Sequence, residues 1–211
     1  RAATMAEGPI EAQQVCEIER DLQQRLDVLL QEATRQLGPI AVEIDARQIR
    51  HLSTHLEQKN AKWEDQWLQG SPSARLQRRL DKLVDRHADF YGSLTAPQTQ
   101  LLRQQLAQSV WSPEWGRQER LRQQRDLLGT LMRIALENLS ARSAELALLG
   151  VWERWLEPRS AADRQRWQDW MEQGCKNLAE LHNSTSQEQR QRAARRLRGY
   201  EKDLRELAGR S

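Results

Sequence analysis

The chain has 211 residues, of which 38% are hydrophobic and 30% are charged. This length can bury a substantial core, in one larger domain or in two small ones. The 33 Lys and Arg residues nearly balance the 30 Asp and Glu residues, so the net charge is only +3. Because the two signs are interleaved, the charge gives little reason to expect nucleic-acid binding. No apolar run approaches the about 20 residues that a bilayer-spanning helix needs.

A short repeated phrase predicts several helix starts. In each copy a residue suited to capping a helix stands three positions before a Gln, and the copies lie at residues 10–14, 44–48, 94–98 and 185–189. The cap side chain accepts a hydrogen bond from the first turn, and the Gln reaches back to the cap N–H. Two Ser-Pro pairs add a cap followed by a first-turn proline. We therefore expect helix starts at Ser71, Thr95, Ser112, Ser160 and Ser186.

Apolar residues recur every three or four positions, which places them on one face of a helix. In chain order this spacing predicts helices over residues 10–37, 45–69, 72–91, 95–110, 113–140, 143–157, 161–182 and 186–207. Gly38-Pro39 is expected to end the first helix, and the helix that follows Ser112 is expected to be the longest. The first helix carries Leu22, Leu26 and Leu29 on the stripe that we expect to be buried.

The connections between these helices are short, which favours antiparallel neighbours. No stretch alternates with period two for long enough to predict a strand. The sequence therefore predicts an all-α fold, an antiparallel multi-helix bundle or array of about eight helices. We expect residues 1–211 to form a single helical domain.

Several stretches of the sequence are distinctive enough to suggest a relationship. They are Gly8–Ile10, Gln14–Cys16, Lys59–Leu68, Gly70–Pro72, Tyr91–Leu94, Arg122–Leu128, Gly174–Cys175, Leu181–Thr185 and Gly199–Leu204. With them, nearly the whole chain resembles the uncharacterised proteobacterial lipoproteins grouped as domain of unknown function 6279. The phrase Leu94–Gln98 also resembles the signature of periplasmic stress chaperones of the Spy and CpxP type.

The resemblance to the lipoprotein family implies a location but no activity. It implies a protein of the bacterial periplasm or cell envelope, anchored to a membrane through a lipidated cysteine upstream of Arg1. On this interpretation the signal sequence and further N-terminal residues precede the chain.

The two cysteines bear on the compartment. Cys16 and Cys175 lie in the first and seventh predicted helices, each beside an apolar stripe. Two unpaired, small core residues are one interpretation. A disulfide is the other, and the resemblance to an envelope family favours it because such bonds persist in oxidising compartments. If the two helices pack side by side, the Cα atoms should lie roughly 5.5 Å apart.

Histidine spacing raises the possibility of a metal site. His51 and His55 are four residues apart, so both imidazoles lie on one helix face. A zinc protease would need Glu at position 52, where the chain has Leu52, and no third ligand can be named. We therefore expect an exposed polar face and no metal or cofactor. His182, at the end of its helix, is expected to act as a cation near the helix C-terminus.

The chain has eight Trp but only one Phe and two Tyr. The Trp residues form pairs at helical spacing, and the pairs are Trp63/Trp67, Trp111/Trp115, Trp152/Trp155 and Trp167/Trp170. Core packing between helices is one interpretation. The other is that a pair lines a groove for a hydrophobic peptide or helix. The candidate partner-binding residues are Trp111, Trp115, Trp152 and Trp155, and we expect the first two to be the exposed pair.

Arginine clusters in the fifth and last predicted helices leave three interpretations open. They are Arg117–Arg125 and Arg190–Arg198, and acidic residues within helical reach dilute the positive charge of each. A solvated face, a nucleic-acid surface and a patch against anionic lipid or an acidic partner are all possible. No base-stacking or helix-turn-helix motif accompanies the clusters, so we expect no nucleic-acid partner.

Together these observations predict a non-enzymatic envelope lipoprotein without a cofactor. Its expected partner is an unidentified envelope protein, bound in a chaperone-like or scaffold role. The alternative is a metal-binding or hydrolytic enzyme that uses His51 and His55.

Overall fold

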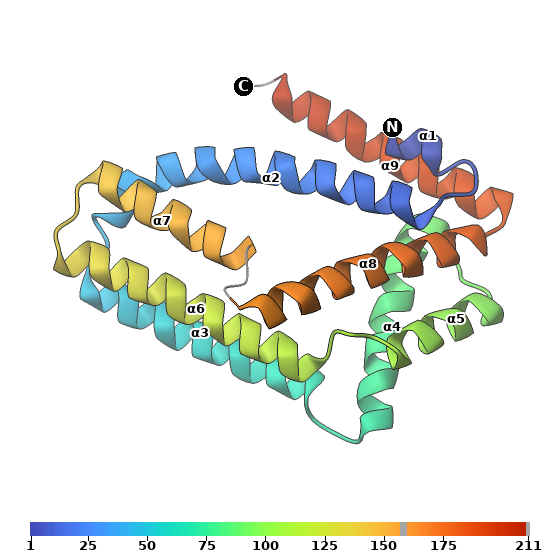
Figure 1. Ribbon diagram of the computed structural model, residues 1–211, viewed down its shortest axis with the longest axis horizontal. Helices are drawn as coiled ribbons and strands as arrows, with labels where there is room; N and C mark the ends of the chain where they lie inside the picture. The colour runs from blue at the N-terminus through green and yellow to red at the C-terminus, as the bar shows by residue number, and fades with distance from the viewer. Residues whose placement is uncertain (157–159, 210–211) are drawn as a thin grey trace. The chain divides into compact units, whose positions relative to one another are not determined.

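The computed structural model describes residues 1–156 and 160–209, which form α-helices joined by short connections (Figure 1). The described residues contain no strand and nine helices: α1 (Ala2–Met5), α2 (Ala12–Ala41), α3 (Ala46–Trp67), α4 (Pro72–Tyr91), α5 (Ala96–Ala107), α6 (Pro113–Leu136), α7 (Ala141–Leu156), α8 (Ala161–Asn183) and α9 (Gln187–Ala208). The all-α prediction is confirmed, with nine helices in place of about eight. Within this part of the chain, no helix is both long and apolar enough to cross a membrane.

The predicted caps begin helices as expected. Each cap hydroxyl accepts a hydrogen bond from the backbone N–H three residues further on, at Ser71, Thr95, Ser112, Ser160 and Ser186. At Asp45, Thr95 and Ser186 the Gln of the repeated phrase also bonds back to the cap N–H. Gln14 bonds back to the Glu11 N–H in the same way. The repeated phrase is therefore a helix start in all four places.

Two expectations about helix ends are wrong. Helix α2 has 30 residues and runs through Gly38 and Pro39 to Ala41, so α2, and not the 24-residue α6, is the longest described helix. Positive φ angles occur at Gly70 and Gly92, where α3 and α4 end. Gly38 instead stays helical and packs against another helix, so it does not act as a terminator.

By their internal contacts the residues fall into two compact units. Unit 1 comprises Arg1–Arg20, Gly70–Val110 and Asp169–Ser211, and unit 2 comprises Asp21–Gln69 and Trp111–Gln168. Helices α2 and α8 contribute residues to both units. The prediction of a single domain over 1–211 stays a prediction, since contacts within each unit do not test whether the units fold together.

Unit 1 has a compact core where α4 meets α5, α8 and α9. Its buried members are Leu80, Tyr91, Leu102, Leu181 and Ala193. Buried Gln98 and Gln105 bond to backbone carbonyls of α8 and its C-terminal turn, at Ser184 and Asn177. These bonds satisfy polar groups that would otherwise be costly to bury.

A buried histidine joins three segments of unit 1. His182 is only 1% exposed. Its Nε2–H donates to the Gly8 carbonyl at 2.8 Å, so Nδ1 accepts from the Tyr91 hydroxyl at 3.0 Å. Burial lowers the pKa of His182 and raises that of Tyr91 to about 12. Burial thus favours the neutral imidazole, which goes against the expectation of a cationic His182.

The two cysteines of unit 1 are joined. The sulfur atoms of Cys16 and Cys175 lie 2.06 Å apart and the Cα atoms 5.5 Å apart, the Cα distance predicted from the sequence. Cys175 is 2% exposed. The pair connects the first turns of α2 to α8 across 159 positions of the sequence.

Unit 2 is built around α3, α6, α7 and the end of α2. The core residues are Ala41, Ile49, Leu131, Ile134, Ala144, Ala147 and Leu148. Helices α3 and α6 lie side by side (Figure 1). Asn60 of α3 bonds to Gln124 of α6 at 2.7 Å, and Arg120 donates to Asn60 at 2.6 Å. Arg154 of α7 binds both carboxylate oxygens of Asp126 on α6. These hydrogen bonds and this ion pair thus hold α3, α6 and α7 together, although the apolar faces of the helices are narrow.

Reduction of the Cys16–Cys175 bond should destabilise the protein. Closing a loop of this length lowers the entropy of the unfolded chain and can contribute up to about 5 kcal/mol. For a chain of this size such a loss lowers Tm by about 10–20 °C. Scanning calorimetry with and without reductant measures the change, and Cys16→Ser/Cys175→Ser should match the reduced protein.

The same bond tests the compartment. Protein trapped with an alkylating agent in its native cell, then unfolded without reductant, should show no free thiol. Two reactive thiols, or a Tm that is unchanged on reduction, would contradict the bond and its use as an argument for an oxidising compartment.

Candidate binding groove

The position of α2 in unit 2 is set by a face of small residues. Thr34, Gly38 and Ala41 are its buried residues. A Cβ atom added to Gly38 would lie 2.7 Å from the Ala141 carbonyl oxygen and 3.0 Å from the Glu145 Cβ. Helix α7 therefore approaches α2 to backbone contact at this point, and only glycine leaves enough space.

This contact directs the leucine stripe of α2 away from α7. The stripe residues are between 40% and 66% exposed, and they are Leu22, Leu26, Leu29, Leu37 and Ile40. The prediction that Leu22, Leu26 and Leu29 are buried is therefore wrong. The physical reason is that the small face lies about a quarter turn around the helix from the stripe. A helix packed on the small face leaves the stripe uncovered.

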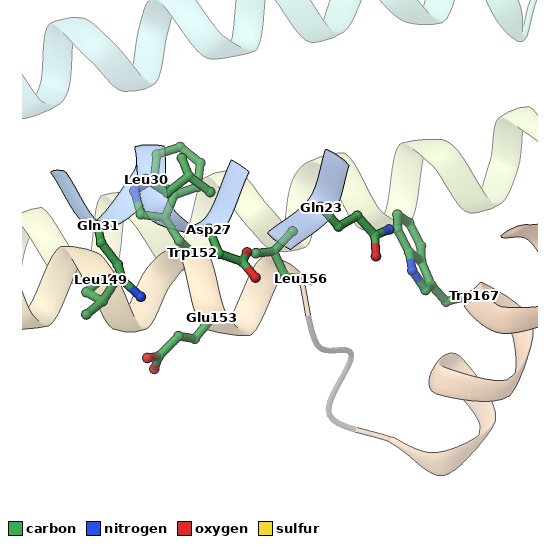
Figure 2. A pocket seen from close by; sticks show the side chains of 9 residues that line it. All are labelled: Gln23, Asp27, Leu30, Gln31, Leu149, Trp152, Glu153, Leu156 and Trp167. Atoms are coloured by element: carbon green, nitrogen blue, oxygen red, sulfur yellow. The ribbon is translucent and has the colours of Figure 1, made fainter. Parts of the chain in front are cut away.

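A groove lies between α2 and α7 in unit 2. Its volume is about 580 Å³, in the range of ligand-binding clefts. It is lined by Gln23, Asp27, Leu30 and Gln31 of α2, by Leu149, Trp152, Glu153 and Leu156 of α7, and by Trp167 of α8. Figure 2 shows Leu30 and Trp152 towards one end, Leu156 near the middle, and Gln23 pointing towards Trp167 at the other end.

The charge in the groove has one sign. Asp27 and Glu153 are the charged residues of the described lining, and neither forms an ion pair within the part of the chain that the structure describes. Glu153 lies in the last turn of α7, where the free carbonyls carry partial negative charge. Arg154, the basic residue of that turn, is held by Asp126 at 2.8–3.0 Å. The groove thus combines apolar walls with uncompensated negative charge.

The candidate pair Trp152/Trp155 lies at this groove. The two rings meet edge to face, with centroids 4.8 Å apart and planes at 79°. Trp152 lines the groove, and Trp155 supports it from α7. The assignment of this pair to partner binding stays a prediction, but the structure places Trp152 where a partner could reach it.

The expectation that Trp111 and Trp115 form an exposed pair is wrong. Trp115 is only 7% exposed, and the Arg166 guanidinium lies 5.8 Å from its ring centroid. Trp111 is half-buried because its indole packs on Gly116, where a Cβ would come within 2.7 Å of the ring. The helix start at Ser112 is thus folded into unit 2, which leaves the pair little surface for a partner.

Sequence reasoning missed three components of the groove. It named Trp167 only as a member of a Trp pair outside the candidate partner-binding residues, and it assigned no role to Asp27 or Glu153. The signal that could have found the groove is the spacing of Thr34, Gly38 and Ala41, which marks a second, small-residue face on α2.

The histidine candidates have no third ligand among the residues that the structure describes. His51 and His55 are both exposed on α3, as expected. The described residues contain no group of three or more His, Cys, Asp or Glu side chains arranged to hold a metal ion.

The chain belongs to a family of unknown function, DUF6279, whose model matches residues 1–149. This confirms the family resemblance seen in the sequence. No curated protein and no solved structure matches the chain, so the likeness of Leu94–Gln98 to periplasmic stress chaperones has no support from these comparisons.

Replacement of Gly38 by alanine should destabilise the protein. The added Cβ would meet the Ala141 carbonyl, and such overpacking costs about 1–3 kcal/mol. This exceeds the about 1 kcal/mol by which alanine favours a helix over glycine. Urea unfolding measures the change in the free energy of unfolding.

Gly129→Ala is the matched control. Gly129 is an exposed residue of α6 in the same unit, and a Cβ atom there would meet nothing within 4 Å. This variant should gain about 0.5–1 kcal/mol from helix propensity alone. Equal stabilisation by both substitutions would show that α7 does not contact Gly38.

Proposed function

We propose that this chain is a non-enzymatic lipoprotein of the bacterial cell envelope that binds a helical segment of another protein along α2. The observation that carries the proposal is the exposed leucine stripe of α2, which adjoins a groove lined by two tryptophans. Large exposed apolar surfaces of this kind are typical of interaction sites, and Trp is enriched among residues that dominate binding energy.

The spacing of the stripe supports a helix as the bound segment. Leu22, Leu26, Leu29 and Ala33 keep to the four- and three-residue intervals of a heptad repeat, and Ile40 lies one heptad beyond Ala33. Side chains in this pattern form the holes that receive the side chains of a second helix. The stripe extends for about 27 Å at 1.5 Å per residue, which suits a partner helix of four to five turns.

The groove supports specificity for that segment. Leu30 lies one turn beyond Leu26 on the same side of α2, so it connects the stripe to the groove. A helix on the stripe could place one side chain between Leu30 and Trp152. Such an anchor in a pocket beside a broader apolar face is the usual arrangement of a helix-binding site.

The envelope location rests on two supports. The family resemblance implies a lipoprotein, and the paired Cys16 and Cys175 are compatible with an oxidising compartment. A protein held at a membrane, with an apolar face for helices, suits a chaperone-like or scaffold role.

Site-specific photo-crosslinking tests the binding surface in the native envelope. The benzophenone amino acid p-benzoylphenylalanine at position 29, which is 66% exposed, should give a discrete adduct with another protein. The same amino acid at position 58, an exposed residue of α3, should give none. Adding Leu22→Asp should abolish the adduct from position 29 because an uncompensated charge then enters the apolar interface.

Two results would overturn the proposal. The first is no adduct from position 29 in cells that express the protein at its native level. The second is the same adducts from positions 29 and 58, because a non-specific surface would give this result.

A further inference from the structure

The negative charge of the groove in unit 2 limits which side chains the bound segment can place there. We infer that the groove binds a lysine or arginine side chain of the partner helix, with Asp27 and Glu153 as counter-ions and Trp152 against its apolar stem. This inference rests on the proposed helix-binding function and specifies the partner as a basic amphipathic helix.

The first support is the absence of an internal role for the two carboxylates. Asp27 and Glu153 are exposed and pair with no cation among residues 1–156 and 160–209. By contrast, nearby Asp126 and Glu64 are bound by arginines within unit 2, at 2.8 Å and 2.6 Å. Asp27 and Glu153 thus differ from Asp126 and Glu64 in having no cation partner among the described residues.

The second support is the electrostatic position of the groove. Glu153 adds a negative charge at the C-terminal end of α7, where a cation would be favoured over an anion. Asp27 lies on the facing helix. A bound cation would relieve the unfavourable placement of Glu153, whereas an anionic lipid headgroup or a nucleic acid would be repelled.

The third support is the aromatic lining. Lys and Arg pack their methylene stems along apolar surface while the charged end stays near water. A cation over the face of a Trp ring gains about 0.5–2 kcal/mol, according to how far it is desolvated. Trp152 lies in the same lining as the two carboxylates, whereas Trp167 lies at the other end of the groove, as Figure 2 shows. The groove can thus hold the stem and the charge of one basic residue together.

A matched set of peptides tests the inference. Three 20-residue helical peptides carry Leu at the a and d positions of a heptad repeat and differ only in their flanking residues, which are Lys, Gln or Glu. Titration calorimetry with the disulfide-bonded protein should show the Lys peptide binding about tenfold more tightly than the Gln peptide. The Glu peptide should bind most weakly, and the preference for Lys should shrink at high salt.

Charge variants identify the site of the preference. Asp27→Asn/Glu153→Gln should remove the preference for Lys and leave the affinity for the Gln peptide unchanged. The control Glu57→Gln/Asp65→Asn removes two exposed carboxylates of α3 and should keep the preference. Trp152→Ala should weaken all three peptides. Circular dichroism and Tm confirm that each variant is folded.

The possible failures are distinguishable. If no peptide binds, the proposed helix-binding surface is wrong and this inference fails with it. If all three peptides bind equally, or if the preference for Lys persists in Asp27→Asn/Glu153→Gln, the surface stands and the inference is overturned.

Discussion

The backbone contact between α2 and α7 at Gly38 determines the surface of unit 2. Gly38 has no Cβ atom, so the Ala141 carbonyl can come close to it. Helix α2 therefore turns its small residues towards α7. The leucine stripe then faces away, and the groove lies between the two helices. The exposure of the stripe is therefore a consequence of one steric constraint.

The apolar faces of the helices are narrow, and interactions other than apolar packing help to hold the helices together. Unit 1 combines a small core with the Cys16–Cys175 bond and the buried Tyr91–His182–Gly8 connection. Unit 2 adds Arg154 bound to Asp126 between α6 and α7. Buried polar groups that are fully bonded fix one arrangement of helices, which a narrow apolar stripe specifies weakly. Unit 2 can thus keep the leucine stripe of α2 exposed.

Local features of the fold could be predicted from the sequence, whereas helix partners could not. Caps such as Ser71 and Thr95 act within one turn, so their geometry follows from a few adjacent residues. The pairing of Cys16 with Cys175 needed the family resemblance as well as the stripes beside them. Periodicity could not reveal that α2 would bury Thr34 and Gly38 and expose Leu29, because an apolar stripe predicts a buried face without naming what covers it. The exposed pair was misplaced for the same reason, since Trp115 lies under Arg166 and Trp111 packs on Gly116, and no local pattern signals these contacts.

Hydroxyl-radical footprinting of the purified protein, read by mass spectrometry, tests the exposed stripe most directly. The account predicts that Leu22, Leu26 and Leu29, which are 44–66% exposed, are modified readily. Leu80, Leu102 and Leu181, which are at most 1% exposed, should be protected in the same sample. Protection of the three α2 leucines to the level of these core leucines would contradict the account, because the stripe would then be covered within the folded chain.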